Sequence, residues 1–323
     1  MNDLIKTKSL NYLYLISSRL EYIELCAMEM KYIFGEISNE NYHLSDTLVD
    51  INRSVFIKGI VTILYKHPSL DAIEQKMKDD ELSYNNYKIH FMKFDDTSYQ
   101  TRLNAMRLLG TTIEGDFAIK DPDIEFILTK INGDWIFGEL QSNPNAWKQR
   151  RKKPHSYSHS LDITIAKTVI NIAINNDFNT TIIDPCCGIG TVVIEGRYAN
   201  VNIKGYEINP LVKHKCNLNL EHYGFIPDVI KQDMLESTEI FDVAILDLPY
   251  GHYSNISTEE QKALITKLQT ISNKSLIITM EDMSKEIKGA GLKIIDSCEI
   301  KKSNTFKRYL TLCVNQNNKK TST

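Results

Sequence analysis

The sequence predicts an α/β fold in its second half: a mostly parallel sheet with helices on both faces, preceded by an α+β region. Three observations predict this fold. From about Ser158 onward, strand-like and helix-like segments alternate, which is the order of a parallel sheet covered on both faces. A glycine-rich turn joins one of the first strands to a helix. The first 140 or so residues mix strands with short helices and contain no such turn.

Length and composition describe a globular protein of two or three domains. The chain has 323 residues, of which 42% are hydrophobic and 24% charged, enough to build a core. Its net charge of -3 gives no general attraction to nucleic acid, so any such binding needs a local patch. No apolar run approaches the roughly 18 residues of a membrane span, and no signal peptide is recognisable. We therefore expect a cytoplasmic location.

The six cysteines form no Cys-x-x-Cys pair, and no histidine lies at zinc-ligand spacing beside them. We therefore expect reduced, mostly buried thiols and no metal. The adjacent pair Cys186-Cys187 is expected to pack the glycine-rich turn rather than to act in redox chemistry.

The first 140 or so residues are predicted as α+β. Residues 11–17 are predicted as a strand and 19–34 as a helix that ends at Gly35. Asn132-Gly133 is the strongest hairpin signal in the chain. The helix should bury a stripe of Leu20, Ile23, Ala27, Met30 and Phe34, and further elements are expected within 55–65 (strand), at 86–94 (strand), at 98–109 (helix ended by Gly110) and at 124–130 and 134–140 (the hairpin strands).

Positive charge is concentrated between Trp147 and His155, where five cations occupy six consecutive positions. Such a run is often only a solvated surface. Its place just before the glycine-turn domain equally favours contacts with phosphates, which position a nucleic acid without reading its sequence. Both interpretations stay open on composition alone.

The second half is predicted to end in an antiparallel hairpin, because only residues 301–304 join its last two strands and this is too short for a crossover. Asn209 is a good N-cap and Pro210 suits the first position of a helix. The expected helices are 162–175, 191–199, 210–223, 258–270 and a short one before 292; the expected strands end at 184 and cover 202–207, 228–232, 242–247, 275–280, 292–300 and 305–314.

A ligand site is predicted where the strand ending at Asp184 meets the glycine-rich turn. Pro185 cannot continue the hydrogen-bond ladder of a strand, so the backbone turns there. Gly188 and Gly190 permit backbone angles and a close ligand approach that a Cβ would block, and a helix follows from Thr191. This arrangement is typical of a site for a nucleotide-like ligand.

Three carboxylates are expected beside that turn, because ligands of open α/β sheets lie at the carboxyl ends of the strands. Asp184 precedes the turn. Glu207 follows Gly188 by about 20 residues, the offset of an acid that binds ribose hydroxyls. Asp233 closes the next strand. A dinucleotide site would need a third glycine where Val193 stands, so another nucleotide-like ligand is indicated.

The chemistry is predicted at Asp247-Leu248-Pro249-Tyr250, after the fourth strand of this domain. Pro249 ends the strand, so the Asp247 carboxylate and the Leu248 carbonyl can both face a planar substrate that Tyr250 stacks upon. This pattern suits an exocyclic amine, which has N–H donors to direct and a lone pair to expose. Methyl transfer to that amine mainly requires proximity and alignment, and it needs neither a metal nor a covalent nucleophile.

These motifs resemble those of amino-group methyltransferases that use S-adenosylmethionine: 184–191 resembles their motif I, and 247–250 their motif IV. Residues 153–162 and the helix after them are similar to the segment that opens the catalytic domain of THUMP-containing tRNA guanine-N(2)-methyltransferases, the enzymes acting on guanosine ten and their bacterial relatives. The resemblance covers 150–314. It implies a class I, Rossmann-like domain with a seven-stranded sheet at 148–323, preceded by a ferredoxin-like region (1–60) and a THUMP-like RNA-binding region (61–147).

The resemblance also implies residue roles. The turn would hold the methionine part of S-adenosylmethionine, Glu207 its ribose and Asp233 its adenine amine, while 155–160 would line its other side. The motif IV residues would hold and stack on a guanine flipped out of its helix. The expected residues are Asp184, Pro185, Cys186, Gly188, Gly190, Thr191, Glu207, Asp233, His155 and Ser160 for the cofactor; Asp247, Leu248, Pro249 and Tyr250 for catalysis; and Lys148, Arg150, Arg151, Lys152 and Lys153 for RNA, with no metal.

Two departures from the family pattern are visible: motif IV carries Leu248 where proline is commoner, and the THUMP-like region is short and not markedly basic. The leading hypothesis is methylation of guanosine in tRNA. The alternatives are an amine methyltransferase acting on DNA or protein glutamine, and a non-catalytic RNA-binding protein that keeps the fold. Eukaryotic relatives need a small activating partner, and the sequence does not say whether this chain does.

Overall fold

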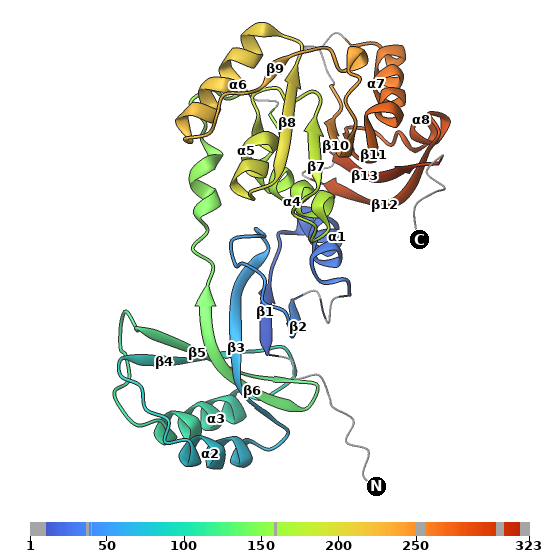
Figure 1. Cartoon of the computed structure of the whole chain (residues 1–323). Coiled ribbons are helices and arrows are strands. Elements are labelled where there is room, and N and C mark those ends of the chain that lie inside the picture. The colour runs from blue at the N-terminus through green and yellow to red at the C-terminus, as the bar shows by residue number, and fades with distance from the viewer. Residues whose placement is uncertain are drawn as a thin grey trace. The chain divides into compact units, whose positions relative to one another are not determined.

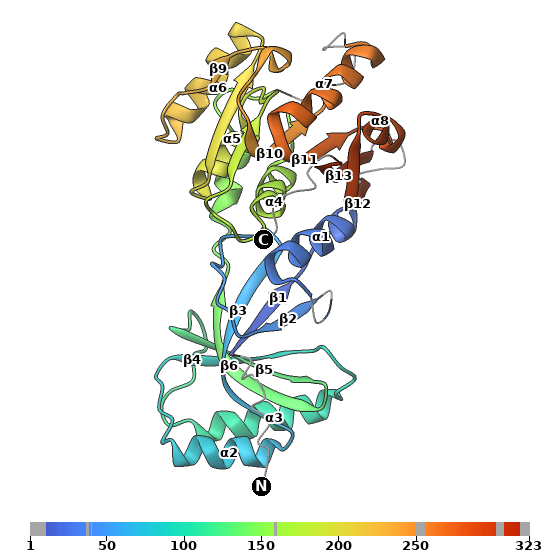
Figure 2. The same cartoon turned by 45° about the vertical axis from the view of Figure 1, so that its right-hand side comes forward.

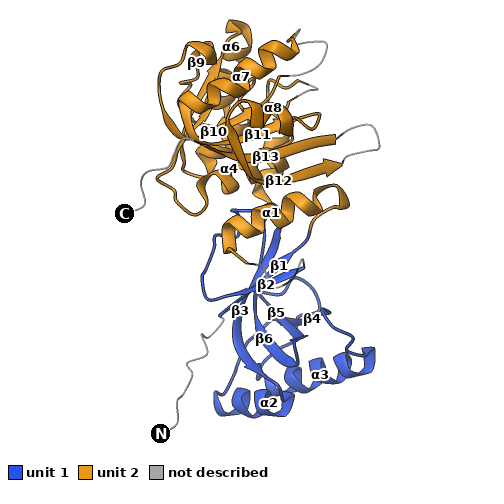
Figure 3. Ribbon diagram, turned by 90° about the vertical axis from the view of Figure 1, so that its right-hand side faces the viewer, with its two compact units in different colours: residues 1–17, 37–144 blue, residues 18–36, 145–323 orange. Residues whose placement is uncertain are grey.

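The computed structural model describes residues 11–36, 39, 41–157, 160–249, 256–301 and 307–316. It divides into two compact units (Figure 3). Unit 1 contains residues 1–17 and 37–144, and unit 2 contains residues 18–36 and 145–323. No helix in the described ranges is long and apolar enough to cross a membrane.

Unit 1 is built on one continuous sheet. Among the described residues it has six strands in the order β2-β1-β3-β6-β5-β4; β4 and β5 are parallel, and the other neighbours are antiparallel. The boundary expected at residue 60 falls inside β3, which pairs with both β1 and β6, so the sheet is not divided there. The strands are β1 (Tyr12–Ile16), β2 (Tyr42–Ser45), β3 (Ile57–His67), β4 (Tyr87–Met92), β5 (Ile124–Ile131) and β6 (Asp134–Ser142).

The predicted hairpin is confirmed. β5 and β6 pair antiparallel up to Ile131 and Asp134, so Asn132-Gly133 forms the whole turn. Asn132 has φ 52° and Gly133 φ 91°. Both angles are positive, as the common two-residue hairpin turn requires.

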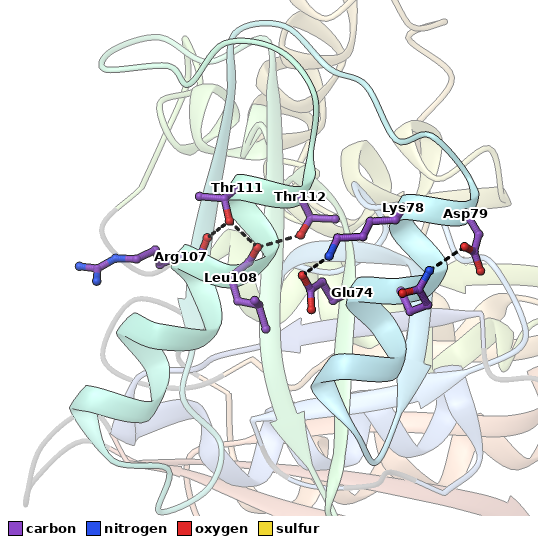
Figure 4. Close-up of polar contacts among 8 residues, drawn as sticks. Glu74, Lys78, Asp79, Arg107, Leu108, Thr111 and Thr112 are labelled. Carbon is purple, nitrogen blue, oxygen red and sulfur yellow. Dashed lines mark hydrogen bonds and ion pairs between the residues drawn. The ribbon is translucent and has the colours of Figure 1, made fainter.

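Two helices cover one face of this sheet (Figures 1 and 2). α2 (Leu70–Asp79), which the sequence analysis did not predict, begins at the cap Ser69 and carries the surface pair Glu74–Lys78 (Figure 4). α3 (Tyr99–Thr112) continues through Gly110 and does not end there as predicted. The glycine at this position is explained by packing and not by the end of the helix. A Cβ on Gly110 would lie 3.0 Å from the Phe117 ring.

Residues 18–36 belong to unit 2, although the strands on either side of them, β1 and β2, belong to unit 1. A 3-10 turn (Leu20–Tyr22) leads into α1 (Ile23–Phe34), which packs on α4 and β12. The predicted stripe is wrong except at Met30, which is fully buried: Leu20 is 90% exposed and Ile23 42%. The buried face instead contains Glu29, whose carboxylate accepts a 2.6 Å hydrogen bond from Asn171.

Unit 2 confirms the predicted α/β fold. Its seven described strands have the order β12-β13-β11-β10-β7-β8-β9; β7 to β11 are parallel, and β13 is antiparallel to both β11 and β12. After β7, the chain adds β8 and then β9 on one side of it. It then returns to the other side of β7 with β10, followed by β11, so the strand order reverses between β7 and β10. The strands are β7 (Thr181–Asp184), β8 (Asn202–Glu207), β9 (Ile230–Lys231), β10 (Phe241–Asp247), β11 (Ser272–Thr279), β12 (Leu292–Lys301) and β13 (Lys307–Asn315).

Helices cover this sheet (Figures 1 and 2). All twelve residues of α4 are buried, because α1, α5 and the sheet surround it. α7 packs its apolar face on strand residues such as Ile183, Leu246 and Ile277. The helices of unit 2 besides α1 are α4 (Ile163–Ile174), α5 (Thr191–Tyr198), α6 (Pro210–His222), α7 (Thr258–Ile271) and α8 (Ser284–Gly289), with 3-10 turns at Ala146–Arg151 and Met234–Glu236.

Candidate active site

The topology brings Asp184 and Asp247 together. They end β7 and β10, the adjacent central strands between which the strand order reverses. Asp184 is only 3% exposed, and burial, followed by the charge of Asp247, raises the pKa of its carboxyl well above the usual value. Ligands of such sheets bind at this crevice. Both acids therefore lie where the sequence placed a ligand site.

Glu207 ties the end of β8 to the glycine-rich turn. Its Oε2 accepts a 3.0 Å hydrogen bond from the Gly188 amide, and its Oε1 accepts a 2.8 Å bond from the Asn209 amide. Burial raises the pKa of Glu207, while these backbone donors oppose the rise. The carboxylate thus fixes the turn and the start of α6, and its remaining lone pairs can accept hydroxyl groups.

Asp233 caps the short turn that follows β9. Its Oδ1 accepts a 2.9 Å hydrogen bond from the Leu235 amide. The next residue, Met234, is buried, and its sulfur lies 3.7 Å from the Cys186 thiol. Burial raises the pKa of that thiol well above its usual value, which suits a neutral packing residue and not a nucleophile.

A pocket of about 560 Å³ lies over these strand ends, within the usual size range of small-molecule sites. Carboxylates and apolar side chains share its wall, a combination that fits a nucleoside: acids for the ribose hydroxyls and base amine, and apolar groups for the ring. The residues present therefore fit the predicted cofactor. The wall contains Pro185, Cys186, Glu207, Ile208, Asn209, Val212, Gln232, Asp233, Met234, Leu235, Asp247, Leu248, Pro249, Ile256, Glu260 and Leu264.

Asp247 carries an ion pair. Arg308, on β13, places Nη1 3.1 Å from Asp247 Oδ1, and the two side chains are 5% and 22% exposed. Burial raises the pKa of Asp247 to about 6, although the charge and hydrogen bond of Arg308 act to lower it. The carboxylate is consequently charged at neutral pH and still faces the pocket.

The residues after Asp247 are held from two sides. Leu248 is 2% exposed, and its amide donates to the Ile278 carbonyl at 2.9 Å. Gln261, on α7, donates from Nε2 to the Pro249 carbonyl at 3.0 Å. The structure thus brings three of the four motif IV residues to the pocket, and the fourth, Tyr250, lies outside the described residues.

Six of the predicted cofactor residues are not part of the pocket wall: Asp184, Gly188, Gly190, Thr191, His155 and Ser160. Asn219, fully buried on α6, holds both backbone polar groups of His155 at 2.9 and 3.0 Å, and it also donates to the Ile189 carbonyl in the glycine-rich turn. Ser160 donates to the Tyr157 carbonyl. Asn219 therefore fastens the segment before α4 to the turn.

The basic segment divides into exposed and buried parts. Lys148, Arg151 and Lys152 are exposed, while Lys153 is half-buried and burial lowers the pKa of its ammonium. The structure corrects the prediction that Arg150 contacts RNA. Arg150 is 9% exposed and makes a bidentate pair with Glu195 at 2.7 Å for both bonds, because a buried guanidinium requires a partner of opposite charge.

Three residues that contact the site were not predicted from the sequence: Arg308, Asn219 and Gln261. Arg308 had a usable signal, since an arginine in the apolar run 308–314 must find a carboxylate if the strand is buried. Asn219 stands between buried apolar residues of α6, which is a weaker signal. Gln261 lies on an amphipathic helix, and no feature of the sequence indicates its contact with Pro249.

Gly190 is expected to tolerate alanine less well than Gly188. Both have positive φ, 83° and 54°, but a Cβ at 190 would lie 2.5 Å from the Cys216 sulfur, whereas one at 188 meets nothing within 4 Å. Gly188→Ala should cost about 1–2 kcal/mol of unfolding free energy for the left-handed backbone, and Gly190→Ala about 1–3 kcal/mol more for the clash. Urea unfolding checks both, and adding Cys216→Ala should recover part of the second loss. Equal losses would contradict the packing explanation.

Glu207→Gln is expected to weaken cofactor binding about 10- to 100-fold, the equivalent of one charge-assisted hydrogen bond. The amide that replaces one carboxylate oxygen would face a backbone N–H donor, either that of Gly188 or that of Asn209. Calorimetric titration measures the change. Glu239→Gln is the matched control, because Glu239 pairs with Lys204 on the surface, outside the pocket wall. Unchanged affinity in Glu207→Gln would refute this role.

Comparison with known proteins finds similarity to methyltransferases. Residues 150–280 match the model of an RMKL-like methyltransferase domain, UPF0020. The tRNA (guanine(10)-N2)-dimethyltransferase of Methanothermobacter thermautotrophicus is 27% identical over 238 residues, 67% of this chain and 70% of that protein. The predicted resemblance to tRNA guanine-N(2)-methyltransferases is therefore confirmed.

Two solved structures are similar at greater distance. TrmN from Thermus thermophilus has a TM-score of 0.49 at 11% identity and covers 94% of this chain and 99% of its own. Magnesium protoporphyrin IX methyltransferase from Synechocystis PCC 6803, solved with bound SAM, has a TM-score of 0.42 at 15% identity and covers 54% and 93%.

Proposed function

We propose that the protein methylates the exocyclic amine of a guanosine in tRNA, starting from the match of residues 150–280 to the model of an RMKL-like methyltransferase domain. The methyl donor is S-adenosylmethionine. One observation carries the proposal: the charged carboxylate of Asp247 faces a nucleoside-sized pocket at the switch point of the sheet. The curated relative, a tRNA guanine methyltransferase, supports the choice of substrate.

Residues of the pocket wall are assigned to the donor by their chemistry. Glu207 accepts hydrogen bonds from ribose hydroxyls, and Asp233 accepts one from the adenine amine. Ile208 and Leu235 supply apolar contacts to the base. S-adenosylmethionine, when bound, supplies a methyl group on a positively charged sulfur.

Asp247 is assigned to the acceptor amine. Methylation replaces one hydrogen of the amine by a methyl group, so one proton must leave the nitrogen. A carboxylate that accepts a hydrogen bond from that amine orients the nitrogen lone pair, stabilises the positive charge that would develop on the nitrogen, and can accept the proton that leaves. The Leu248 carbonyl is proposed as the second acceptor. Tyr250 remains the predicted stacking partner of the base and lies outside the described residues.

RNA contacts are proposed for the exposed cations Lys148, Arg151 and Lys152 and for the half-buried Lys153, which precede the methyltransferase domain. Unit 1 is proposed as the ferredoxin-like and THUMP-like module that binds tRNA. Its continuous sheet supports a single binding module and not two independent ones. The reaction would take place in the cytoplasm.

The proposal is tested by supplying purified protein with radiolabelled S-adenosylmethionine and equal amounts of unmodified tRNA and duplex DNA in one filter assay. Label should enter the tRNA as methylguanosine. Label in DNA, or in a protein glutamine substrate tested in parallel, would favour the alternative amine methyltransferases. Binding of tRNA without turnover would favour a non-catalytic RNA-binding protein.

A further inference from the structure

Arg308 reaches the site from a strand that does not border it. β13 pairs with β11, and β11 pairs with β10, so the arginine reaches across β11 to the end of β10. Its side chain is 5% exposed, and its Nη1 lies 3.1 Å from Asp247 Oδ1. Arg308 is not part of the pocket wall. It therefore acts on the pocket through Asp247.

The surroundings of Asp247 are otherwise acidic. Asp184 approaches from β7, and burial, followed by the charge of Asp247, raises the pKa of the Asp184 carboxyl. Glu207 comes from β8, Asp233 from the turn after β9 and Glu260 from α7, and the neutral thiol of Cys186 lies on the same wall. Burial favours the protonated form of Asp247, and Arg308 opposes it through its charge and its hydrogen bond.

We propose that Arg308 is a positioning residue that holds the Asp247 carboxylate in one orientation and in its charged form for the target amine. The ion pair engages Oδ1, and we assign Oδ2 to the amine. Arg308 makes one contact of 3.1 Å, through Nη1, and its rigid planar guanidinium restricts the direction of that contact more than a flexible ammonium would. The role rests on the proposed function, because it matters only if Asp247 receives an amine.

The test compares Arg308→Met and Arg308→Lys with Lys307→Met. Lys307 is the adjacent cation of β13, and it pairs with Glu299 away from the site, so its replacement removes the same charge without touching Asp247. Methylation of tRNA is measured from pH 5 to 9, with kcat and KM separated. Cofactor affinity is measured by calorimetry, and folding by circular dichroism.

In Arg308→Met, kcat should fall at least about 10-fold at pH 7, and its acid limb should move upward by about one pH unit or more, since an opposite charge at this range lowers a carboxyl pKa by about that amount. Cofactor affinity should stay within about two-fold. Arg308→Lys should keep the acid limb near its wild-type position with a reduced kcat, because it retains charge but not geometry. Lys307→Met should behave as wild type.

An acid limb that does not move in Arg308→Met, with kcat and cofactor affinity lowered together, would overturn the inference and leave Arg308 a structural residue. If Arg308→Met does not fold, the test rests on Arg308→Lys. A full wild-type kcat in Arg308→Lys would also overturn the inference. These outcomes differ from failure of the proposed function, in which the wild-type protein itself would not methylate tRNA.

Discussion

Replacing Asp247 by asparagine is expected to lower the rate of methyl transfer to tRNA at least about 100-fold. The amide can accept a hydrogen bond, but it carries no charge to stabilise the amine as it becomes positive. Its volume is nearly unchanged, so the pocket should persist and S-adenosylmethionine should bind within about two-fold of wild type. Single-turnover methylation and calorimetric titration measure the two quantities separately.

The pH dependence of methylation should also depend on Asp247. Because burial raises the pKa of Asp247 to about 6, the carboxylate of the wild type becomes protonated as the pH falls through 6, and methylation should decline there. The residual activity of Asp247→Asn should lack that acid limb. Asp228→Asn, which alters a surface partner of Arg197, is the isosteric control and should leave rate and profile unchanged. An Asp247→Asn enzyme of normal rate would contradict the assignment of Asp247 to the amine.

Glu195→Ala is expected to cost about 3–5 kcal/mol of unfolding free energy, the typical loss when one partner of a buried ion pair is removed. Glu195 is 1% exposed, and Arg150 makes two 2.7 Å bonds to it while its guanidinium lies 4.0 Å from the centre of the Tyr198 ring. The alanine would leave this buried cation without its carboxylate. Urea unfolding followed by circular dichroism measures the loss.

Two further variants show whether the loss of unfolding free energy in Glu195→Ala comes from the unpaired buried charge or from a non-specific loss of packing. The double variant Arg150→Met with Glu195→Leu should recover most of the stability, since replacing both charges by apolar groups removes the desolvation penalty. Glu239→Ala breaks the exposed pair with Lys204 and should cost no more than about 1 kcal/mol. A Glu195→Ala loss as small as that of Glu239→Ala would show that the pair contributes little.

The features that were predicted from sequence are those encoded by neighbouring residues. Asn132-Gly133 specifies its turn through local backbone angles, and the cap at Asn209 with Pro210 fixes the start of α6. That Asp184 and Asp247 lie at the same edge of the sheet was predictable, because parallel strands end at one edge; that their strands are neighbours was not.

The features that were missed depend on contacts between distant residues. A helix was predicted at 19–34, but its buried face was not, because that face is determined by α4 and β12, which begin at residues 163 and 292. Arg150 looked like the other cations of its segment until the fold placed Glu195 opposite it. Arg308 is separated from Asp247 by 61 positions, and no local pattern links them.

The most direct test of the central claim, that Asp247 directs methylation of a guanosine amine in tRNA, is nucleoside mass spectrometry of total tRNA from cells with and without this gene. We expect one N(2)-methylated guanosine to disappear without the gene, to return with the wild-type gene and to stay absent with the Asp247→Asn variant. Identical nucleoside profiles in all strains, or restoration by Asp247→Asn, would contradict the claim.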